Sequence, residues 1–325
     1  MHMPKVAYII VCWNNQNLLD ECIRSIKSQT YKNRRIIMVD NNSSDDSIKH
    51  VTKNYPEVDV LPQSKNHAFA KGNNIGIQYA LEDSEVEFIS LVNTDATLDP
   101  NWTETILKFA AFKPKGAAFQ TITLDYYDRN TIDSTHVYVA HNGQATQGSW
   151  RRPIATNTDI APQKVFGCNA AAVVYSRAFI EAQPFSEFFD ETMWMYLEDV
   201  DVAARATVMG WDNYVIPGAR AYHMGSASSS NNPGFSLYYT FRNNGAMLVK
   251  NLPLVVLAKV FPRLIKGDID TIRVLIRNNR VHDIKYVVKG RLVGLALLPW
   301  FLGKRLKLRH VVSARSLWRL MLNGY

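Results

Sequence analysis

Apolar runs typical of buried strands alternate with helix-like segments through the first hundred residues, and this order restricts the fold more than any other feature. We expect strands and helices in turn over residues 6–11, 17–29, 35–40, 47–55, 58–61, 73–81 and 87–93. Residues 6–11 are apolar throughout, which is typical of a strand buried on both faces. The βαβαβ order predicts an α/β fold with a mostly parallel, Rossmann-like sheet, helices on both faces and a ligand site at the carboxyl ends of the strands.

Polar clusters follow three of the predicted strands, at residues 13–15, 40–42 and 93–95. Because the carboxyl ends of parallel strands meet at one edge of a sheet, we expect these clusters to lie together. Asn and Asp are also common turn formers and helix caps, so each cluster alone has a purely structural interpretation. Their repetition at the same edge favours a binding site.

Several familiar motifs are missing from the sequence. The chain has neither G-x-G-x-x-G after the first predicted strand nor G-x-x-x-x-G-K-[ST], which argues against an NAD dehydrogenase and a P-loop NTPase. Cys12, Cys22 and Cys168 are too few for a disulfide framework and match no zinc-site spacing. We therefore expect buried thiols in a reducing compartment.

Charge is distributed unevenly along the 325 residues. Residues 240–325 carry 17 Lys or Arg and three acidic residues, a net charge of +14, whereas residues 1–239 carry 20 and 26, a net charge of −6. The basic region contains apolar stretches at 252–265 and 292–302. A helix over the second stretch would be about 16 Å long, too short for a bilayer core of about 30 Å.

Two interpretations of the basic region stay open: an interfacial helix on anionic lipid, or a packed helical subdomain whose charges face water. Nucleic acid is a less suitable partner, because the region lacks zinc spacing, an RNP-type strand and basic heptads. The N-terminal residues lack signal-peptide features, and no run of eighteen apolar residues occurs. We expect a cytoplasmic protein attached peripherally to the inner face of the cell membrane.

Eight segments match a known family in order. They are YIIVCWNN (8–15), IIMVDNNSSDDS (36–47), NHAFAKGNNIGI (66–77), LVNTDATLDP (91–100), FGCNAAAVVYSRAFI (166–180), FFDETMWMYLEDVDVAARATVMGW (188–211), IPGARAYHMGSAS (216–228) and YYTFRNNGAMLVKN (238–251). Together they resemble the inverting glycosyltransferases of family two, which have the glycosyltransferase-A fold, and most of all the bacterial dTDP-rhamnosyltransferases of cell-surface polysaccharide synthesis.

The resemblance spans residues 5–251 and implies a domain organisation. A catalytic domain is expected over 1–251, with a nucleotide-sugar half at 1–95 and an acceptor half at 96–251. A basic, apolar helical tail is expected over 252–325. The oligomeric state stays open.

The resemblance also implies a binding site for a nucleotide-diphosphate sugar. The residues expected to form this site are Val11, Trp13, Asp40, Asn66, Lys71, Asn73, Asn93 and Asp95. Lys71 stands where the family commonly has glycine or another small residue, and Asn93 stands where it has the first Asp of its D-x-D motif. Asp40 ends a predicted strand and can accept the imide N–H of uracil or thymine; an ordinary turn carboxylate is the alternative. The segment 66–74 combines a glycine, a cation and amides before a predicted helix, whose first N–H groups suit anions.

Asn93-Thr94-Asp95 stands in the place of the family's D-x-D motif, whose last Asp binds a divalent cation. The resemblance implies Asp95 and His223 as metal ligands, although a lone His is often structural. Carboxylate and diphosphate oxygens suit Mg²⁺ or Mn²⁺, and an imidazole ligand favours Mn²⁺.

Glu198-Asp199-Val200-Asp201 opens a predicted helix over 200–209, after an aromatic-rich stretch. Acidic residues are favoured at helix N-termini by the backbone dipole, which would be a structural role. Apolar surroundings and neighbouring charges also raise a carboxyl pKa, as a general base requires. The resemblance implies Asp199 as the base, with Glu198 or Asp201 orienting it or holding the acceptor. Trp194 is expected to stack on a sugar or to pack in the core.

The resemblance thus implies an inverting transfer of L-rhamnose from dTDP-L-rhamnose to a hydroxyl of a lipid-linked or polysaccharide acceptor. UDP-hexoses, UDP-N-acetylhexosamines and UDP-galactofuranose are alternative donors. A catalytically silent module that binds nucleotide sugars is the alternative outside enzymes.

Overall fold

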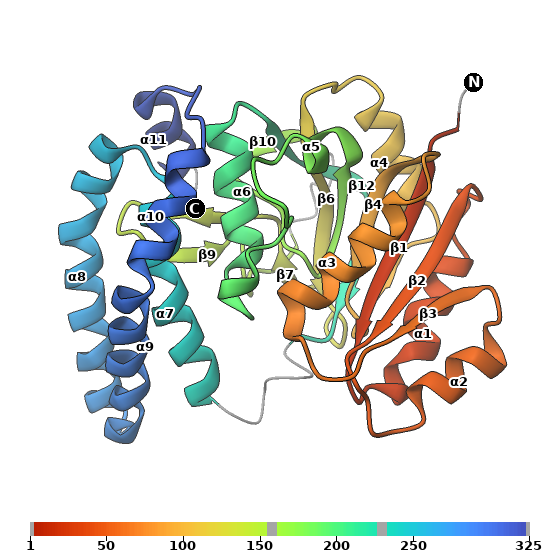
Figure 1. Cartoon of the computed structure of the whole chain (residues 1–325), viewed down its shortest axis with the longest axis horizontal. Coiled ribbons are helices and arrows are strands. Elements are labelled where there is room, and N and C mark those ends of the chain that lie inside the picture. The colour runs from red at the N-terminus through yellow and green to blue at the C-terminus, as the bar shows by residue number, and fades with distance from the viewer. Residues whose placement is uncertain (1–2, 155–160, 226–232, 323–325) are drawn as a thin grey trace.

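The computed structural model describes residues 3–154, 161–225 and 233–322, and its centre is a ten-stranded mixed sheet (Figure 1). The strands are β1 Lys5–Cys12, β2 Arg34–Asp40, β3 Val58–Pro62, β4 Val86–Val92, β5 Ala96–Leu98, β6 Gly116–Asp125, β7 Ile132–Ser134, β8 Val137–Val139, β9 Ala145–Gln147, β10 Gln163–Val165, β11 Ala172–Ser176 and β12 Asp212–His223. Along the sheet the order is β10-β12-β6-β11-β4-β1-β2-β3. Strand β5 pairs with β12, β7 pairs with β6, and β8 and β9 form a separate two-stranded sheet.

The N-terminal half of the sheet is parallel, as the sequence predicts. Strand β1 lies between β4 and β2, and β3 pairs with β2, all in parallel register. Residues Val6–Ile10 of β1 are fully buried, which explains why this strand is apolar on both faces. Cys12 is opposite Asp40 in the register, so the ends of β1 and β2 lie at the same edge.

The second half of the sheet is mixed, because β11 is antiparallel to both of its neighbours, β4 and β6. Strand β12 returns parallel to β6 and reaches His223, which is opposite Ala96 of β5. This pairing brings a residue more than a hundred positions away in sequence to the end of β4. The mixed half therefore places His223 close to Asp95.

Helices cover both faces of the sheet. They are α1 Gln16–Lys27, α2 Ser47–Asn54, α3 Ala68–Leu81, α4 Trp102–Ala110, α5 Arg177–Glu181 and α6 Glu198–Val208, with a 3₁₀ turn at Glu191–Met193. One core contains the inward faces of α1 and α4, for example Ile23 and Trp102. The opposite core contains α3, α5 and α6, for example Ile77 and Phe179. The three cysteines are buried and free, in agreement with the prediction.

Helix α3 begins five residues earlier than the sequence pattern predicts, at Ala68 instead of Asn73. Gly72 and Gly76 lie inside this helix, and because they lack a Cβ atom they let it approach the sheet closely. A Cβ atom on Gly72 would lie 2.8 Å from Val11, and one on Gly76 would lie 2.5 Å from Ile9. The glycine content of this segment reflects helix–sheet packing.

The C-terminal helices gather at the end of the molecule away from α1 and α2 (Figure 1). They are α7 Pro233–Asn251, α8 Leu254–Arg277, α9 Ile284–Ala296, α10 Leu298–Lys307 and α11 Ala314–Leu322, with a 3₁₀ turn at Val281–Asp283. A third core joins α7, α8, α10 and α11 to α6 and the β8–β9 hairpin, and it includes Phe301 of α10 and Leu317 of α11. Helix α9 packs through Val287 in a smaller cluster with Phe241 and Leu275. The apolar stretch 292–302 is divided between two helices, because Pro299 occupies the first turn of α10.

Among the described residues, no single helix has the length and apolar character needed to cross a membrane. The segment Val281–Ala296 and helix α10 meet these criteria only as a pair, which is bent by 51°.

Candidate functional site

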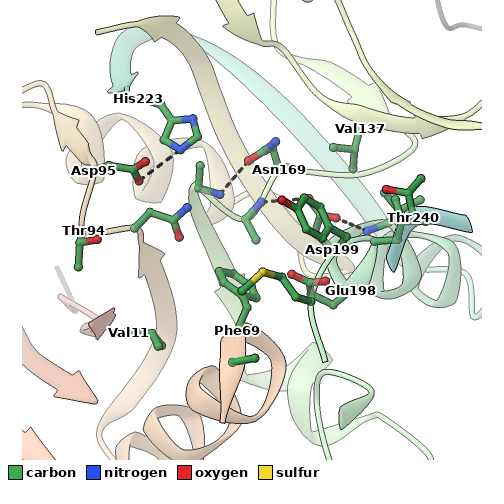
Figure 2. Close-up of a pocket in the computed structure, with 18 of the residues that line it drawn as sticks. Val11, Phe69, Thr94, Asp95, Val137, Asn169, Glu198, Asp199, His223 and Thr240 are labelled. Atoms are coloured by element: carbon green, nitrogen blue, oxygen red, sulfur yellow. Dashed lines mark hydrogen bonds and ion pairs between the residues drawn. The ribbon is translucent and has the colours of Figure 1, made fainter. Parts of the chain in front are cut away.

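A cavity of about 440 Å³ opens at the carboxyl ends of β1 and β4. Its other walls come from the start of α6, the β8–β9 hairpin and Thr240 of α7. Figure 2 shows Asp95 and His223 on one side of the cavity and Glu198 and Asp199 on the other. The site lies where the parallel strands predict it, and the second half of the chain completes it.

The cavity brings together most of the predicted site residues. Those that line it are Val11, Trp13, Asn66, Asn93, Asp95, Glu198, Asp199 and His223. Trp194, Asp40, Lys71, Asn73 and Asp201 are outside the lining.

Asp40 is fully buried at the end of β2, next to the cavity-lining Asn41. Its Oδ2 atom accepts the backbone N–H of Ser43 at 2.9 Å. Its Oδ1 atom has no hydrogen-bond partner within the described part of the chain. A buried carboxylate oxygen without a partner is unfavourable, so this atom is available to a donor group of a ligand.

Lys71 and Asn73 lie in helix α3. Lys71 forms an ion pair with Glu191, with 3.0 Å between Nζ and Oε2, and its side chain is 44% exposed. Asn73 is buried and donates from Nδ2 to the carbonyl of Phe69 in the preceding turn. Both side chains are thus engaged with the protein itself.

His223 is held between two carboxylates. Its Nε2 atom is 3.3 Å from Asp95 Oδ1, and its Nδ1 atom is 3.0 Å from Asp133 Oδ2. Burial lowers the pKa of the imidazole, but the hydrogen bonds that it donates to the carboxylates of Asp133 and Asp95, and their charges, outweigh this effect and raise the pKa to about 10. Asp133 was not among the sequence-predicted residues, and only the pairing of β7 with β6 brings it to this site.

The Asp95–His223 pair fits a divalent cation. Two neighbouring ligands of an octahedral cation at about 2.1 Å lie about 3 Å apart, similar to the separation of these two atoms. No group of three or more His, Cys, Asp or Glu side chains suited to a metal occurs in residues 3–154, 161–225 and 233–322. A cation held at this pair would take its remaining ligands from substrate and water.

Glu198 and Asp199 face the cavity from the first turn of α6. Asp199 Oδ1 accepts a hydrogen bond from the backbone N–H of Val200, and Oδ2 accepts one from the backbone N–H of Ala170 at 3.4 Å. Burial raises the pKa of both carboxyls, and the charge of Asp199 raises that of Glu198 further. Glu198 Oε2 has no hydrogen-bond partner among the described residues. Asp199 is therefore the more readily ionised member of the pair.

Asp201 points away from the cavity. Its carboxylate receives Lys250 Nζ at 2.7 Å, Asn251 Nδ2 at 2.7 Å and Arg205 Nε at 3.1 Å, and all four side chains are buried. The structure thus places Asp201 in a buried network between α6 and α7. Adjacent acidic residues in the sequence occupy two different environments.

Trp194 lies in the loop before α6, where its ring stacks on Tyr239 of α7 with 5.0 Å between centroids. Phe235 contacts both rings. This aromatic cluster lies beside Met195 and Tyr196, which do line the cavity.

Asn15, Asn41 and Thr94 belong to the polar clusters, and Ala68 and Phe69 to the segment 66–74, that the sequence assigns to a binding site. Sequence reasoning missed the other lining residues, which are Val137, Ala145, Thr146, Gln147, Asn169, Ala170, Ala171, Met195, Leu197, Val200 and Thr240. Asn169 and Ala170 belong to the segment 166–180, but a single Asn within it does not by itself indicate a binding residue. The hairpin residues 145–147 carry no signal at all, because only the tertiary fold brings them to the cavity.

Comparisons with known proteins identify the family. Residues 8–182 match the family model "Glycosyl transferase family 2". A GalNAc(5)-diNAcBac-PP-undecaprenol beta-1,3-glucosyltransferase of Campylobacter jejuni is 31% identical over 108 residues, which is 33% of this chain and 35% of the relative. An N-acetylglucosaminyl-diphospho-decaprenol L-rhamnosyltransferase of Mycobacterium tuberculosis is 23% identical over 237 residues, which is 67% of this chain and 76% of the relative.

Solved structures share the fold. The S. aureus TarS 1–349 complex with UDP-GlcNAc has a TM-score of 0.55 and 17% identity, and the match covers 98% of this chain and 90% of that one. The mannosyltransferase PcManGT of Pyrobaculum calidifontis, in complex with GDP-Man and Mn²⁺, has a TM-score of 0.57 and 12% identity over 92% and 88% of the two chains. These neighbours confirm the predicted glycosyltransferase-A fold with added C-terminal helices.

The match to the Campylobacter relative covers only about a third of that protein's length, and several other curated relatives match over a similar share. The family model, by contrast, covers more than half of this chain. The chain belongs to glycosyl transferase family 2.

Proposed function

We propose that this protein is an inverting glycosyltransferase that transfers L-rhamnose from dTDP-L-rhamnose to a hydroxyl of a lipid-linked or polysaccharide acceptor. The observation that carries the proposal is the cavity itself, which has Asp199 on one side and the Asp95–His223 pair on the other. Family membership supports nucleotide-sugar transfer. The name of the mycobacterial relative supports rhamnose and a lipid-diphosphate acceptor.

The proposed reaction is a single displacement at the anomeric carbon. Asp199 takes the proton of the acceptor hydroxyl as its oxygen forms the new bond, while the bond from the anomeric carbon to the diphosphate oxygen breaks. The electron pair of that bond leaves with the nucleotide diphosphate, and the anomeric configuration inverts. Glu198, whose pKa is raised by burial and by Asp199, retains its proton near neutral pH and can donate a hydrogen bond.

In this proposal Asp95 and His223 hold Mn²⁺ or Mg²⁺, which supplies positive charge to the leaving diphosphate. Asp133 accepts a hydrogen bond from Nδ1–H of His223 and thereby orients Nε2 toward Asp95. The unpartnered Oδ1 of Asp40 supports its role as acceptor for the imide N–H of thymine or uracil. Val11, Trp13, Asn66, Asn93, Lys71 and Asn73 complete the proposed donor site, the last two after local rearrangement.

A ligand panel tests the donor. The full chain is heated with dTDP-L-rhamnose, UDP-sugars or GDP-sugars in the presence of Mn²⁺, and turnover is then measured with the ligand that stabilises it most. The largest rise in melting temperature with dTDP-L-rhamnose, followed by turnover, is expected. A larger rise with a UDP-hexose, UDP-N-acetylhexosamine or UDP-galactofuranose would overturn rhamnose. Stabilisation without turnover on any lipid-linked or oligosaccharide acceptor would indicate a silent binding module.

The proposal also includes peripheral attachment to the inner, cytoplasmic face of an anionic membrane through the C-terminal helices. Of the twenty large apolar side chains that are exposed in the described part of the chain, fifteen lie between residues 254 and 311. Phe261, Ile265, Ile269 and Ile276 recur along one face of α8 at helical spacing. The exposed Lys266, Arg273 and Arg277 flank them, and such a pattern suits anionic lipid.

Flotation with vesicles that contain phosphatidylglycerol tests this attachment. Since Phe301 and Leu317 belong to the core, point variants are better than a deletion. We expect I265E/I269E to abolish flotation, while F112E, which changes a side chain that is 81% exposed elsewhere, retains it. Equal flotation of both variants would contradict the proposal. A change of oligomeric state without a change in flotation would instead identify α8 as an interface between copies.

A further inference from the structure

The backbone before Glu198 has an unusual conformation. Three non-glycine residues have positive φ angles, 64° at Trp194, 69° at Tyr196 and 69° at Leu197. Large side chains rarely adopt such angles, because the Cβ atom crowds the backbone. Strained backbone persists only where surrounding contacts hold it in place, and such places are concentrated at active sites. Residues 193–197, the pre-catalytic loop, are therefore expected to be held by contacts from other elements.

One side chain of helix α7 binds most of this loop. Asn243 is 1% exposed, and its Nδ2 atom lies 3.0 Å from the carbonyl oxygen of Met193, 2.9 Å from that of Met195 and 2.8 Å from that of Tyr196. A single amide thus contacts three loop carbonyls about fifty positions away in sequence.

The neighbouring Arg242 fixes the orientation of this amide and donates further hydrogen bonds to backbone carbonyls of the same segment. Its Nη1 atom donates to Asn243 Oδ1 at 2.7 Å and to the Met193 carbonyl at 3.2 Å. Its Nη2 atom donates to the carbonyl of Thr192 at 2.7 Å. Because the amide oxygen of Asn243 is engaged by the guanidinium, its NH₂ group must face the loop.

The remaining loop carbonyls have partners as well. The carbonyl of Trp194 accepts the N–H of Ala70 at 3.4 Å, and that of Leu197 accepts the N–H of Asp201 at 2.8 Å in the first turn of α6. The stacking of Trp194 on Tyr239, one helical turn before Asn243, adds an apolar contact to the same face of α7. The loop is therefore held along its whole length, mainly by α7.

We propose that Asn243 and Arg242 are positioning residues that hold the pre-catalytic loop in its strained conformation, so that Glu198 and Asp199 face the cavity. This inference rests on the proposed function, because it assigns a purpose to the orientation of the base. Neither residue lines the cavity, so they act through the loop. If the bonds to the loop are lost, the loop is free to relax to negative φ angles and the first turn of α6 moves with it.

The first test separates positioning from binding and folding. In Asn243→Ala we expect kcat to fall about 100-fold, as for a base displaced by about 1 Å. Affinity for dTDP, measured by calorimetry, is expected to stay within about twofold of wild type, since the donor residues are untouched. Asn243→Asp, which keeps the shape but presents oxygen to three carbonyl oxygens, is expected to lose at least as much. Asn244→Ala is the matched control, because Asn244 is buried in the same helix and, within the described part of the chain, forms no hydrogen bond to the loop.

A second test uses glycine to relieve the strain. Glycine adopts positive φ without the Cβ penalty, so Leu197→Gly lets the loop keep its conformation with fewer restraints. In the Leu197→Gly background, Asn243→Ala is expected to lower kcat by a much smaller factor than in wild type. Equal factors in both backgrounds would contradict a role in holding strained backbone.

The pH profile gives a third readout that a merely structural role would not change. Burial raises the pKa of Asp199 to about 6, so the acidic limb of kcat/KM is expected near that pH in the wild type. A released loop exposes the carboxylates to water, which moves this limb to lower pH in Asn243→Ala. An unchanged limb, or an unchanged kcat in a folded Asn243→Ala, would overturn the inference while Asp199→Asn still tests the proposed function separately.

Discussion

Three acidic side chains within four positions, Glu198, Asp199 and Asp201, have different surroundings and hence different chemistry. Glu198 and Asp199 face a cavity, where burial raises the pKa of both. Asp201 faces Lys250, Arg205 and Asn251, which satisfy its charge. The helical geometry of α6 produces this division, because positions 199 and 201 point about 200° apart around the axis.

Replacement of the base tests the central assignment. Asp199→Asn keeps size and polarity but cannot accept a proton, so kcat is expected to fall about 10²- to 10⁴-fold with donor affinity unchanged. Turnover with the donor that stabilises the protein most is the measurement. Asp270→Asn, which removes an exposed carboxylate on α8, is the control. If Asp199→Asn retains most of its turnover, another residue is the base.

The cation site gives a prediction on binding rather than rate. Asp95→Ala removes the carboxylate next to His223, so Mn²⁺ is expected to increase the affinity for dTDP much less than in wild type. Calorimetric titrations with Mn²⁺ and with EDTA provide the comparison. An identical effect of Mn²⁺ on wild type and Asp95→Ala would exclude this site as the place where a cation supports the donor.

The raised pKa of Glu198 makes stability depend on pH. Folding raises this pKa from 4.5 to about 8, so between these values the native state holds a proton that the unfolded chain has released. The free energy of unfolding therefore decreases as pH rises through this window, and the Glu198 contribution is fully unfavourable above it. Glu198→Gln is expected to lose this dependence and to be the more stable form at pH 8. Urea denaturation at pH 5 and pH 8 measures it; parallel changes in both proteins would contradict the prediction.

At the scale of elements, the sequence predicts the N-terminal half well, because its strands and helices follow simple periodicities. All four predicted strands between residues 6 and 93 and the helices between them exist, with ends within two residues except for the start of α3. The predicted start of α3 is wrong, because the polar and glycine-containing segment 66–72 has no helical apolar period, whereas Gly72 packs closely on Val11 in the folded chain. The hairpin β8–β9 and the strand β7 could not be predicted, since three-residue strands have no measurable period.

The close approach of α3 to the sheet is testable at Gly76. A Cβ atom there would lie 2.5 Å from Ile9 Cγ2 and 3.2 Å from Val39 Cγ2, so helix and sheet must separate. Gly76→Ala is expected to destabilise the protein by about 1–3 kcal/mol, although alanine favours helix elsewhere. Urea denaturation measures this change, with Gln78→Ala, two positions along the same helix, as the control. A more stable Gly76→Ala would show that the interface has room.

For the whole molecule, part of the charge difference between the acidic residues 1–239 and the basic region 240–325 is neutralised by ion pairs between the two parts. Lys250 of α7 bonds Asp190 and Asp201, and Lys304 of α10 bonds Asp190 and Glu187. The cations lower the pKa of Asp190 despite its burial. Composition alone could not reveal this, because it gives the sum of charges without their partners.

Lys250 pairs with two buried carboxylates at once, those of Asp190 and Asp201. Lys250→Met keeps most of the side-chain volume but leaves the buried Asp190 and Asp201 with fewer partners, so we expect a loss of about 3–5 kcal/mol in the free energy of unfolding. Lys259→Met, on the exposed face of α8, is the control. Similar unfolding midpoints for both variants would mean that Arg205, Asn251 and Lys304 suffice.

Because α7 holds the pre-catalytic loop, the loop depends on residues that are synthesised after it. A ribosome makes the chain from the N-terminus, so the carboxylates at 198 and 199 emerge well before Asn243 and Lys250 do. All strands of the sheet end by His223, so they precede the side chain of Asn243 that holds the loop. On the proposed role of Asn243, the loop can take its active conformation only after residues that follow the whole sheet have been made.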